Sequence, residues 1–254
     1  FLDFVADADI MSMADPDDAN GDGISGVPNW INLRGYVTPR ANAMVQNGQH
    51  IGRFGKKAAT YDLLQQTATA YNQDMGISSN FEPYDTYTGH EIDPEVSNQT
   101  IQDVVFYLQT LKVPVPRKED NSEVKAGKQL FQKIQCASCH RPELKTGYSP
   151  IAVLSFKTFQ PYTDLLLHDM GAALNDGYTE GSATTAEWRT PPLWGLGLSK
   201  NSQGGKYFLL HDGRAKSIEE AILLHGGEAQ KSKAQYQALS PQEKQQLIQF
   251  LESL

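Results

Sequence analysis

Apolar residues recur at intervals of three and four in two segments of the first 135 residues, the spacing of a helix with one buried face. These segments are Asn98–Leu111 and Ser122–Gln135, and a further helix is expected around Tyr61–Tyr71. The apolar positions are Ile101, Val104, Val105, Leu108 and Leu111 in the first, and Val124, Ala126, Leu130, Phe131 and Ile134 in the second. The chain is therefore predicted to be mainly α-helical.

Two helix starts are predicted near the C-terminus. Ser217 and Ser240 each stand three residues before a glutamate, which is the pattern of a capping box. Pro241 strengthens the second start, because proline is favoured in the first helical turn, and Gly226 predicts the end of the first helix. The last helix places Leu247, Phe250, Leu251 and Leu254 on one face. Residues 141–215 are expected to be a long irregular stretch.

The run Val113-Pro114-Val115-Pro116 predicts a linker. Proline cannot donate the helical hydrogen bond and restrains the residue before it, so the helix ending at Leu111 cannot continue. We expect two domains, 1–112 and 122–254, separated by a linker over 113–121.

Charge and hydropathy exclude some classes of partner. The 254 residues include 22 basic and 30 acidic side chains and no basic run, so nucleic acid is not an expected partner. No apolar stretch approaches the length of a membrane span. The chain opens at Phe1 without Met or a basic leader region, and we expect that Phe1 is not the natural start.

The two cysteines of the chain stand together in Cys136-Ala137-Ser138-Cys139-His140. This string is the attachment signature of a c-type haem, in which both thiols bind the porphyrin and the imidazole binds the iron. Thioether attachment implies export, so a periplasmic or otherwise exported location is expected. One covalent haem c is predicted, held by Cys136, Cys139 and His140.

Three other interpretations of the cysteine pair fit the sequence less well. A thioredoxin-type dithiol calls for a βαβ context, and the helical pattern before Cys136 does not supply one. A structural zinc site usually needs four ligands, and there is no third cysteine. A simple disulfide would leave His140 without a role.

An acidic loop near the N-terminus resembles a calcium-binding loop. Asp18, Asn20 and Asp22 alternate before Gly23, as oxygen ligands do in calcium loops. The twelfth loop position is Asn29 rather than an acidic residue. A possible calcium site and a solvated acidic turn both remain open.

Six sequence blocks resemble the bacterial di-haem oxidoreductase family, whose members are often catalogued as thiol oxidoreductases and are similar to di-haem cytochrome c peroxidases. The blocks occur in the family's order along nearly the whole chain: Gly52–Gly55, Asp74–Ile77, His168–Gly171, Glu187–Gly195, His211–Arg214 and His225–Ala229. The resemblance implies two cytochrome c-like domains, each carrying one haem, and a peroxidase-like activity.

The chain departs from the family in having one haem motif instead of two. The resemblance places the other motif upstream, so this chain looks like the C-terminal part of such a protein. Residues 1–112 would then be the remainder of a first cytochrome c-like domain, and 122–254 a C-terminal cytochrome c-like haem domain with long irregular loops. In c-type cytochromes the first and last helices cross closely, and Gly127 is the expected point of approach to Phe250 and Leu251.

The resemblance also implies a position for the sixth ligand of the iron. In the related peroxidases the His-Asp-Gly block precedes a helix whose methionine binds iron, and the matching position here is His225. Ile218, Ile222 and His225 share one helix face, which agrees. A hydrogen-bonded core histidine is the alternative for His225, and Met170 is the alternative sixth ligand. His211 is expected to be structural, and His50 and His90 carry no adjacent signal.

Two arginines, Arg189 and Arg214, could pair with haem propionates through bidentate contacts, and a surface ion pair is equally compatible with each. The leading hypothesis for the chain is the electron-transfer part of a peroxidase-like oxidoreductase, which takes electrons from a donor protein or small donor and relays them to an upstream haem. On its own, the chain is expected to transfer electrons rather than to catalyse. The alternatives are a stand-alone electron-transfer cytochrome domain and a thiol/disulfide protein using Cys136 and Cys139. Nothing in the sequence indicates an oligomeric state.

Overall fold

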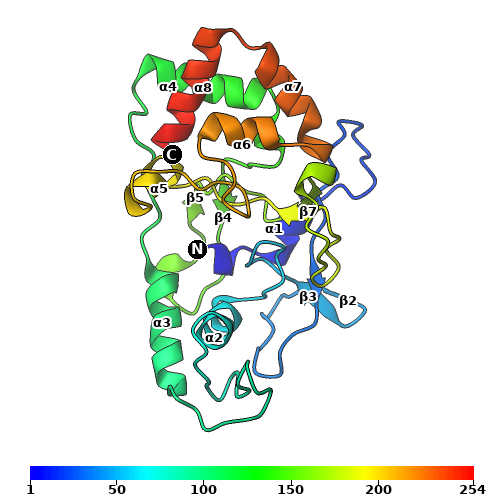
Figure 1. Ribbon diagram of the computed structural model, residues 1–254, viewed down its shortest axis with the longest axis vertical. Coiled ribbons are helices and arrows are strands. Elements are labelled where there is room, and N and C mark those ends of the chain that lie inside the picture. The colour runs from blue at the N-terminus through cyan, green and yellow to red at the C-terminus, as the bar shows by residue number, and fades with distance from the viewer.

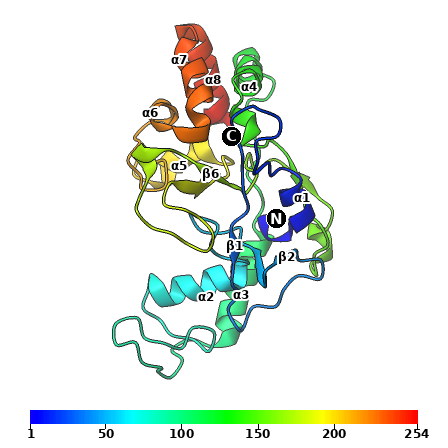
Figure 2. The ribbon, with the colours of Figure 1, turned by 90° about the vertical axis from the view of Figure 1, so that its right-hand side faces the viewer.

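The computed structural model describes all residues, 1–254, as an elongated molecule with helices gathered at its two ends (Figure 1). Helices α4, α6, α7 and α8 lie at one end, and α2 and α3 lie at the other. The N-terminal segment and the short strands occupy the middle, as the view turned by 90° also shows (Figure 2). None of the helices combines the length and the apolar character needed to cross a bilayer.

The fold is mainly helical, as predicted. The eight α-helices are α1 (Asp7–Met11), α2 (Leu63–Gln73), α3 (Asn98–Thr110), α4 (Ser122–Lys133), α5 (Leu196–Ser202), α6 (Ile218–Leu224), α7 (Gln230–Ala238) and α8 (Pro241–Ser253). Side chains cap three of the longer helices: Asp62 accepts from Gln65, Ser97 from Thr100 and Asn121 from Glu123 and Val124, in each case from the backbone N–H. The helices predicted around 61–71, at 98–111 and at 122–135 are thereby confirmed to within two residues at each end.

The strands are short and form three small antiparallel sheets. Strands β1 (Trp30–Ile31), β3 (Gln49–Ile51) and β2 (Val45–Gln46) make one sheet in that order. Strand β4 (Leu144–Lys145) pairs with β5 (Thr158–Phe159), and β6 (Leu167–Asp169) pairs with β7 (Glu187–Arg189) in the register His168 to Trp188. Residues 141–215 are therefore mostly irregular, with these two pairs, α5 and two 3-10 turns, Ala152–Leu154 and Ala172–Leu174, as their regular elements.

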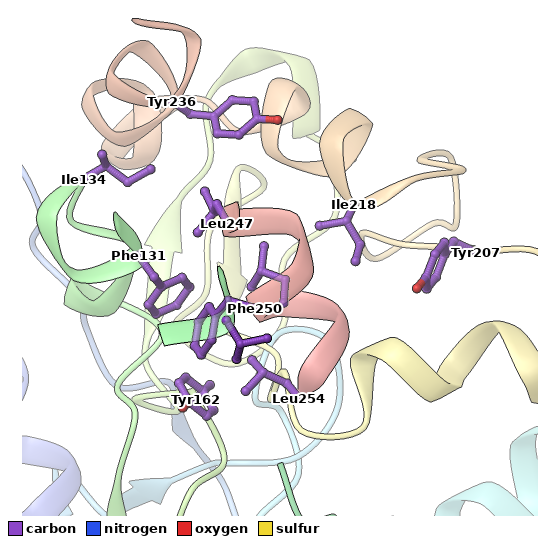
Figure 3. Packing of buried hydrophobic residues seen from close by; sticks show 11 residues of the cluster. Phe131, Ile134, Tyr162, Tyr207, Ile218, Tyr236, Leu247, Phe250 and Leu254 are labelled. Atoms are coloured by element: carbon purple, nitrogen blue, oxygen red, sulfur yellow. The ribbon is translucent and has the colours of Figure 1, made fainter. Parts of the chain in front are cut away.

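The main core lies between α4 and α8. Phe131 of α4 packs edge-on against Phe250 of α8 with ring centroids 5.4 Å apart, and Tyr162 contacts both rings (Figure 3). Ser240 and Glu243 form the complete capping box at the start of α8. At α6 the box is half made: Ser217 accepts from the Glu220 backbone, but the Glu220 carboxylate accepts from the N–H of Lys216, one residue earlier than the pattern predicts.

A second core joins residues from both sides of the predicted linker. Val5, Ile10 and Ile51 pack with Leu144, Phe159, Leu165 and Leu166. Val5 also forms a β-bridge with Thr146, and Val27 forms one with Leu167. Residues 111–118 contain no helix or strand. The division into two domains at 113–121 stays a prediction, and the shared core means that the two parts pack directly on one another.

Candidate haem site

A cavity of about 280 Å³ brings together most of the residues singled out in the sequence. It lies beside the α4–α8 core, and its walls come from the turn after α4, from the segment around β6 and β7, and from α6. Its lining is mostly hydrophobic, which suits a flat apolar ring. The predicted haem residues among its lining are Cys136, Cys139, His140, Met170, Arg189 and His225.

The turn that carries the two cysteines follows α4 directly. Gln135 adopts a left-handed conformation, φ +65°, which ends the helical path. Cys136–Ser138 then form a single 3-10 turn, and the backbone N–H of His140 donates to the Cys136 carbonyl at 3.0 Å. Both cysteines are free thiols and both reach the cavity wall. One compact turn thus presents two thiols and one imidazole to the same space.

His140 presents one ring nitrogen to the protein and leaves the other without a protein partner. Its Nδ1–H donates to the carbonyl of Tyr162 at 3.1 Å, so Nε2 carries the free lone pair. Burial, with the nearby His225, lowers the pKa of His140 to about 4. A neutral imidazole with a fixed tautomer is the form that binds iron.

His225 is arranged in the same way. It caps the C-terminal end of α6, and its Nδ1–H donates to the carbonyl of Ala221 at 2.7 Å, which leaves Nε2 free. Burial lowers its pKa as well. Ile218, Ile222 and His225 all line the cavity, as their shared helix face predicts. The cavity therefore holds two neutral imidazoles, His140 and His225, each with Nε2 available.

Met170 lines the same cavity and remains the alternative to His225. It follows β6, and its backbone N–H donates to the carbonyl of Ala186. His211 is also in the wall, where it stacks on Trp188 with ring centroids 4.2 Å apart and Nε2 3.3 Å from the Arg189 carbonyl. Those contacts match the structural role expected for His211. His50 and His90 do not line the cavity.

The two arginines predicted to meet propionates lie in different surroundings. Arg189 lines the cavity, and its Nε donates to the Gly55 carbonyl at 2.9 Å. Burial lowers its pKa to about 10 although the charge of Asp164 opposes this shift, and no carboxylate forms an ion pair with it. Arg214 is exposed, pairs with Asp212 and is absent from the cavity wall. Arg214 thus forms a surface ion pair, and a propionate role for Arg189 stays a prediction.

A buried polar network beside Cys139 was not predicted, although His168 and Glu228 each lie in one of the sequence blocks that resemble the family. His168 is 3% exposed and lies between two carboxylates, with Nε2 2.8 Å from Asp164 and Nδ1 2.7 Å from Glu228. Its Nδ1 is also 3.6 Å from the Cys139 sulfur. Burial opposes protonation, but the hydrogen bonds that His168 makes with Asp164, Cys139 and Glu228 outweigh it and raise the pKa of His168 well above its usual value. His168 is thus an imidazolium that donates to both carboxylates.

The acidic loop folds as a series of tight turns. Asp18 accepts from the N–H of Gly23 at 3.1 Å, Asn20 from Asp22 at 2.8 Å and Asp22 from Ile24 at 2.9 Å. The side-chain oxygens of the three candidate ligands thus already accept backbone hydrogen bonds. Calcium binding by Asp18, Asn20 and Asp22 stays a prediction.

Comparisons with known proteins place the chain in a family. The curated proteins contain no match. Among solved structures, hydrazine synthase of Kuenenia stuttgartiensis, pressurised with xenon, aligns with a TM-score of 0.40 and 17% identity over 67% of this chain and 58% of that chain. The family model described as "Di-haem oxidoreductase, putative peroxidase" matches residues 1–254. The chain therefore belongs to the di-haem oxidoreductase family.

Proposed function

We propose that this chain binds one haem c covalently through Cys136 and Cys139, with His140 and His225 as axial ligands, and that it relays electrons to a second haem upstream. The observation that carries the proposal is the pair of neutral imidazoles in one apolar cavity, each tied through Nδ1 and free at Nε2. Both thiols reach the same cavity, and membership of a di-haem family supports haem as the cofactor.

The protein groups would orient the cofactor and shield it. A bound haem supplies a one-electron iron couple. The Tyr162 and Ala221 carbonyls fix the tautomers of His140 and His225 and increase the donor strength of their free nitrogens. The hydrophobic lining excludes water, and Arg189 offers an unpaired positive charge for a propionate.

A haem with both axial positions taken by histidine should work as a relay. Bis-histidine ligation favours a lower potential than histidine/methionine ligation. It also leaves no open coordination position for peroxide, so the peroxidase-like step belongs to the upstream haem. The donor would be a redox protein or a small reductant, and the protein would be exported to the bacterial periplasm.

Two alternatives can be compared with the site. A stand-alone electron-transfer cytochrome uses the same residues without catalysis, and it differs only in lacking the upstream haem. A working dithiol needs a low thiol pKa, whereas burial raises the pKa of Cys136 to about 12 and also raises that of Cys139. The environment of these thiols therefore disfavours the dithiol function.

The test is haem retention by the protein exported from a bacterium that matures c-type cytochromes. After denaturing electrophoresis, peroxidase-activity staining should show haem on the chain, and Cys136→Ala with Cys139→Ala should abolish the stain. A pyridine-haemochrome spectrum should count one haem per chain. Extraction of all haem into acidic acetone would contradict covalent attachment. An intact mass equal to that of the chain without haem would favour the dithiol function instead.

A further inference from the structure

Glu228 stands three residues after His225 and ties together segments that are far apart in the sequence. Its side chain is 14% exposed. The carboxylate accepts from the backbone N–H of Ser25 at 3.0 Å, from that of Asp169 at 3.0 Å and from Nδ1 of His168 at 2.7 Å. These partners are 203, 59 and 60 residues away along the chain. One side chain therefore holds the N-terminal loop, β6 and the turn after α6 in fixed relation.

The cationic partner of Glu228 is itself held rigidly. His168 donates from its other nitrogen to Asp164, which is 2% exposed. A carboxylate bound to a buried imidazolium and to two amides has few alternative positions, because each lost hydrogen bond would leave a buried polar group unpaired. Glu228 thus acts as a clamp on the chain that follows His225.

The turn over Gly227–Ala229 packs backbone against backbone on the segment after β6. A Cβ at Gly227 would lie 2.1 Å from the Asp169 carbonyl oxygen, and one at Gly226 would lie 2.9 Å from the Met170 carbonyl oxygen. Such contacts require glycine. The turn and the end of β6 are therefore in tight backbone contact. A displacement of the Glu228 carboxylate would shift the turn and, with it, the neighbouring His225.

The clamp also reaches the cavity from the N-terminal side. Ile24, directly before Ser25, lines the same cavity as His225. The acidic loop ends here, since Asp15 donates from its backbone N–H to the Ser25 carbonyl at 2.7 Å. Residues from the N-terminal third of the chain thus contact both the cavity and the residue that anchors the turn after His225.

We propose that Glu228 is a positioning residue for His225: its carboxylate anchors the turn that follows the imidazole and thereby links axial ligation of the iron to the Ile24–Gly26 segment. The inference rests on the proposed ligation by His225. It adds a residue outside the haem attachment motif that determines how firmly the sixth ligand is held.

The test compares Glu228→Ala with the proposed ligand variant His225→Ala in the ferric haem protein. Glu228→Ala should keep the haem covalently bound but show a fraction of high-spin iron, because His225 is released more often. Cyanide, which must displace the sixth ligand, should bind about tenfold faster, the lower range for losing a hydrogen bond to a charged group. Glu228→Gln keeps an acceptor oxygen for the amides and should show a smaller effect. Amide hydrogen exchange at Ser25 and Asp169 should accelerate in Glu228→Ala and less so in Glu228→Gln.

Glu95→Ala is the matched control. Glu95 also anchors a loop by accepting from a backbone N–H, that of Ser78 at 3.0 Å, but it does not line the cavity. This variant should leave the spectrum and cyanide rate unchanged. If His225→Ala becomes high-spin while Glu228→Ala matches the control, the positioning role is wrong and His225 ligation stands. If His225→Ala stays low-spin, the ligand assignment is wrong and the inference falls with it. Should Glu228→Ala fail to fold, Glu228→Gln gives the same decision.

Discussion

Gly127 of α4 lies against the backbone of α8 so closely that a Cβ at this position would be 2.0 Å from the carbonyl oxygen of Gln246 and 2.7 Å from Cβ of Phe250. Gly127→Ala should therefore lower the free energy of unfolding by about 1–3 kcal/mol, since overpacking outweighs the better helix propensity of alanine. Urea unfolding would measure the change.

Gly35→Ala is the control for this variant. Gly35 is exposed, and a Cβ there would meet nothing within 4 Å. It should leave the stability within about 0.5 kcal/mol of the original chain. If the two variants were equally stable, the close crossing of α4 and α8 would not limit the size of the side chain at position 127.

The crossing at Gly127 was predictable because the resemblance to c-type cytochromes implies that the first and last helices cross closely. The apolar spacing of 122–135 and of the last helix fixes which faces meet, and a glycine in one of these faces indicates close approach. The cysteine turn and the shared face of Ile218, Ile222 and His225 were likewise readable from spacing. The cysteine turn and the α6 face each involve residues within one or two helical turns of each other.

The polar network could not be predicted, because its members are distant in sequence. His168 and Glu228 are 60 residues apart, and Ser25 is 203 residues from Glu228.

The strands of two or three residues are too short to show an alternating pattern, and α7 was missed because Tyr236 is its only buried residue. No sequence pattern distinguishes Arg189 from Arg214. Only the fold shows that Arg189 lines the cavity and that Arg214 is exposed.

His211 should make the protein less stable in mild acid. Burial lowers its pKa to about 4 from an ordinary value of 6.5. Between these values the unfolded chain binds a proton that the folded protein does not, so the free energy of unfolding falls as pH falls from about 6.5 towards 4. His211→Gln should flatten this decline, measured by urea unfolding of the haem protein at pH 7 and pH 5. The exposed His90→Gln should keep the original slope, and an unchanged slope in His211→Gln would rule out this origin.

Trypsin should cut the native protein in the linker. Lys118 is exposed and lies in the stretch without helix or strand. The fragments 1–118 and 119–254 should stay together on a sizing column, because Val5, Ile10 and Ile51 pack with Leu144, Phe159, Leu165 and Leu166. They should separate in urea. Protection of 113–121 with cleavage inside 122–135 would contradict the proposed division of the chain.

Replacement of each candidate ligand should decide the sixth position of the iron. His225→Ala removes an imidazole whose Nε2 is free in the cavity, so the ferric spectrum should change from low-spin towards high-spin and peroxide should react faster. Met170→Ala should remain low-spin, because the two proposed ligands, His140 and His225, are both intact. The original protein should also lack the weak near-infrared band of methionine ligation. If Met170→Ala becomes high-spin while His225→Ala stays low-spin, methionine is the ligand, and the higher potential expected of a thioether ligand would place this haem on the donor side of the relay.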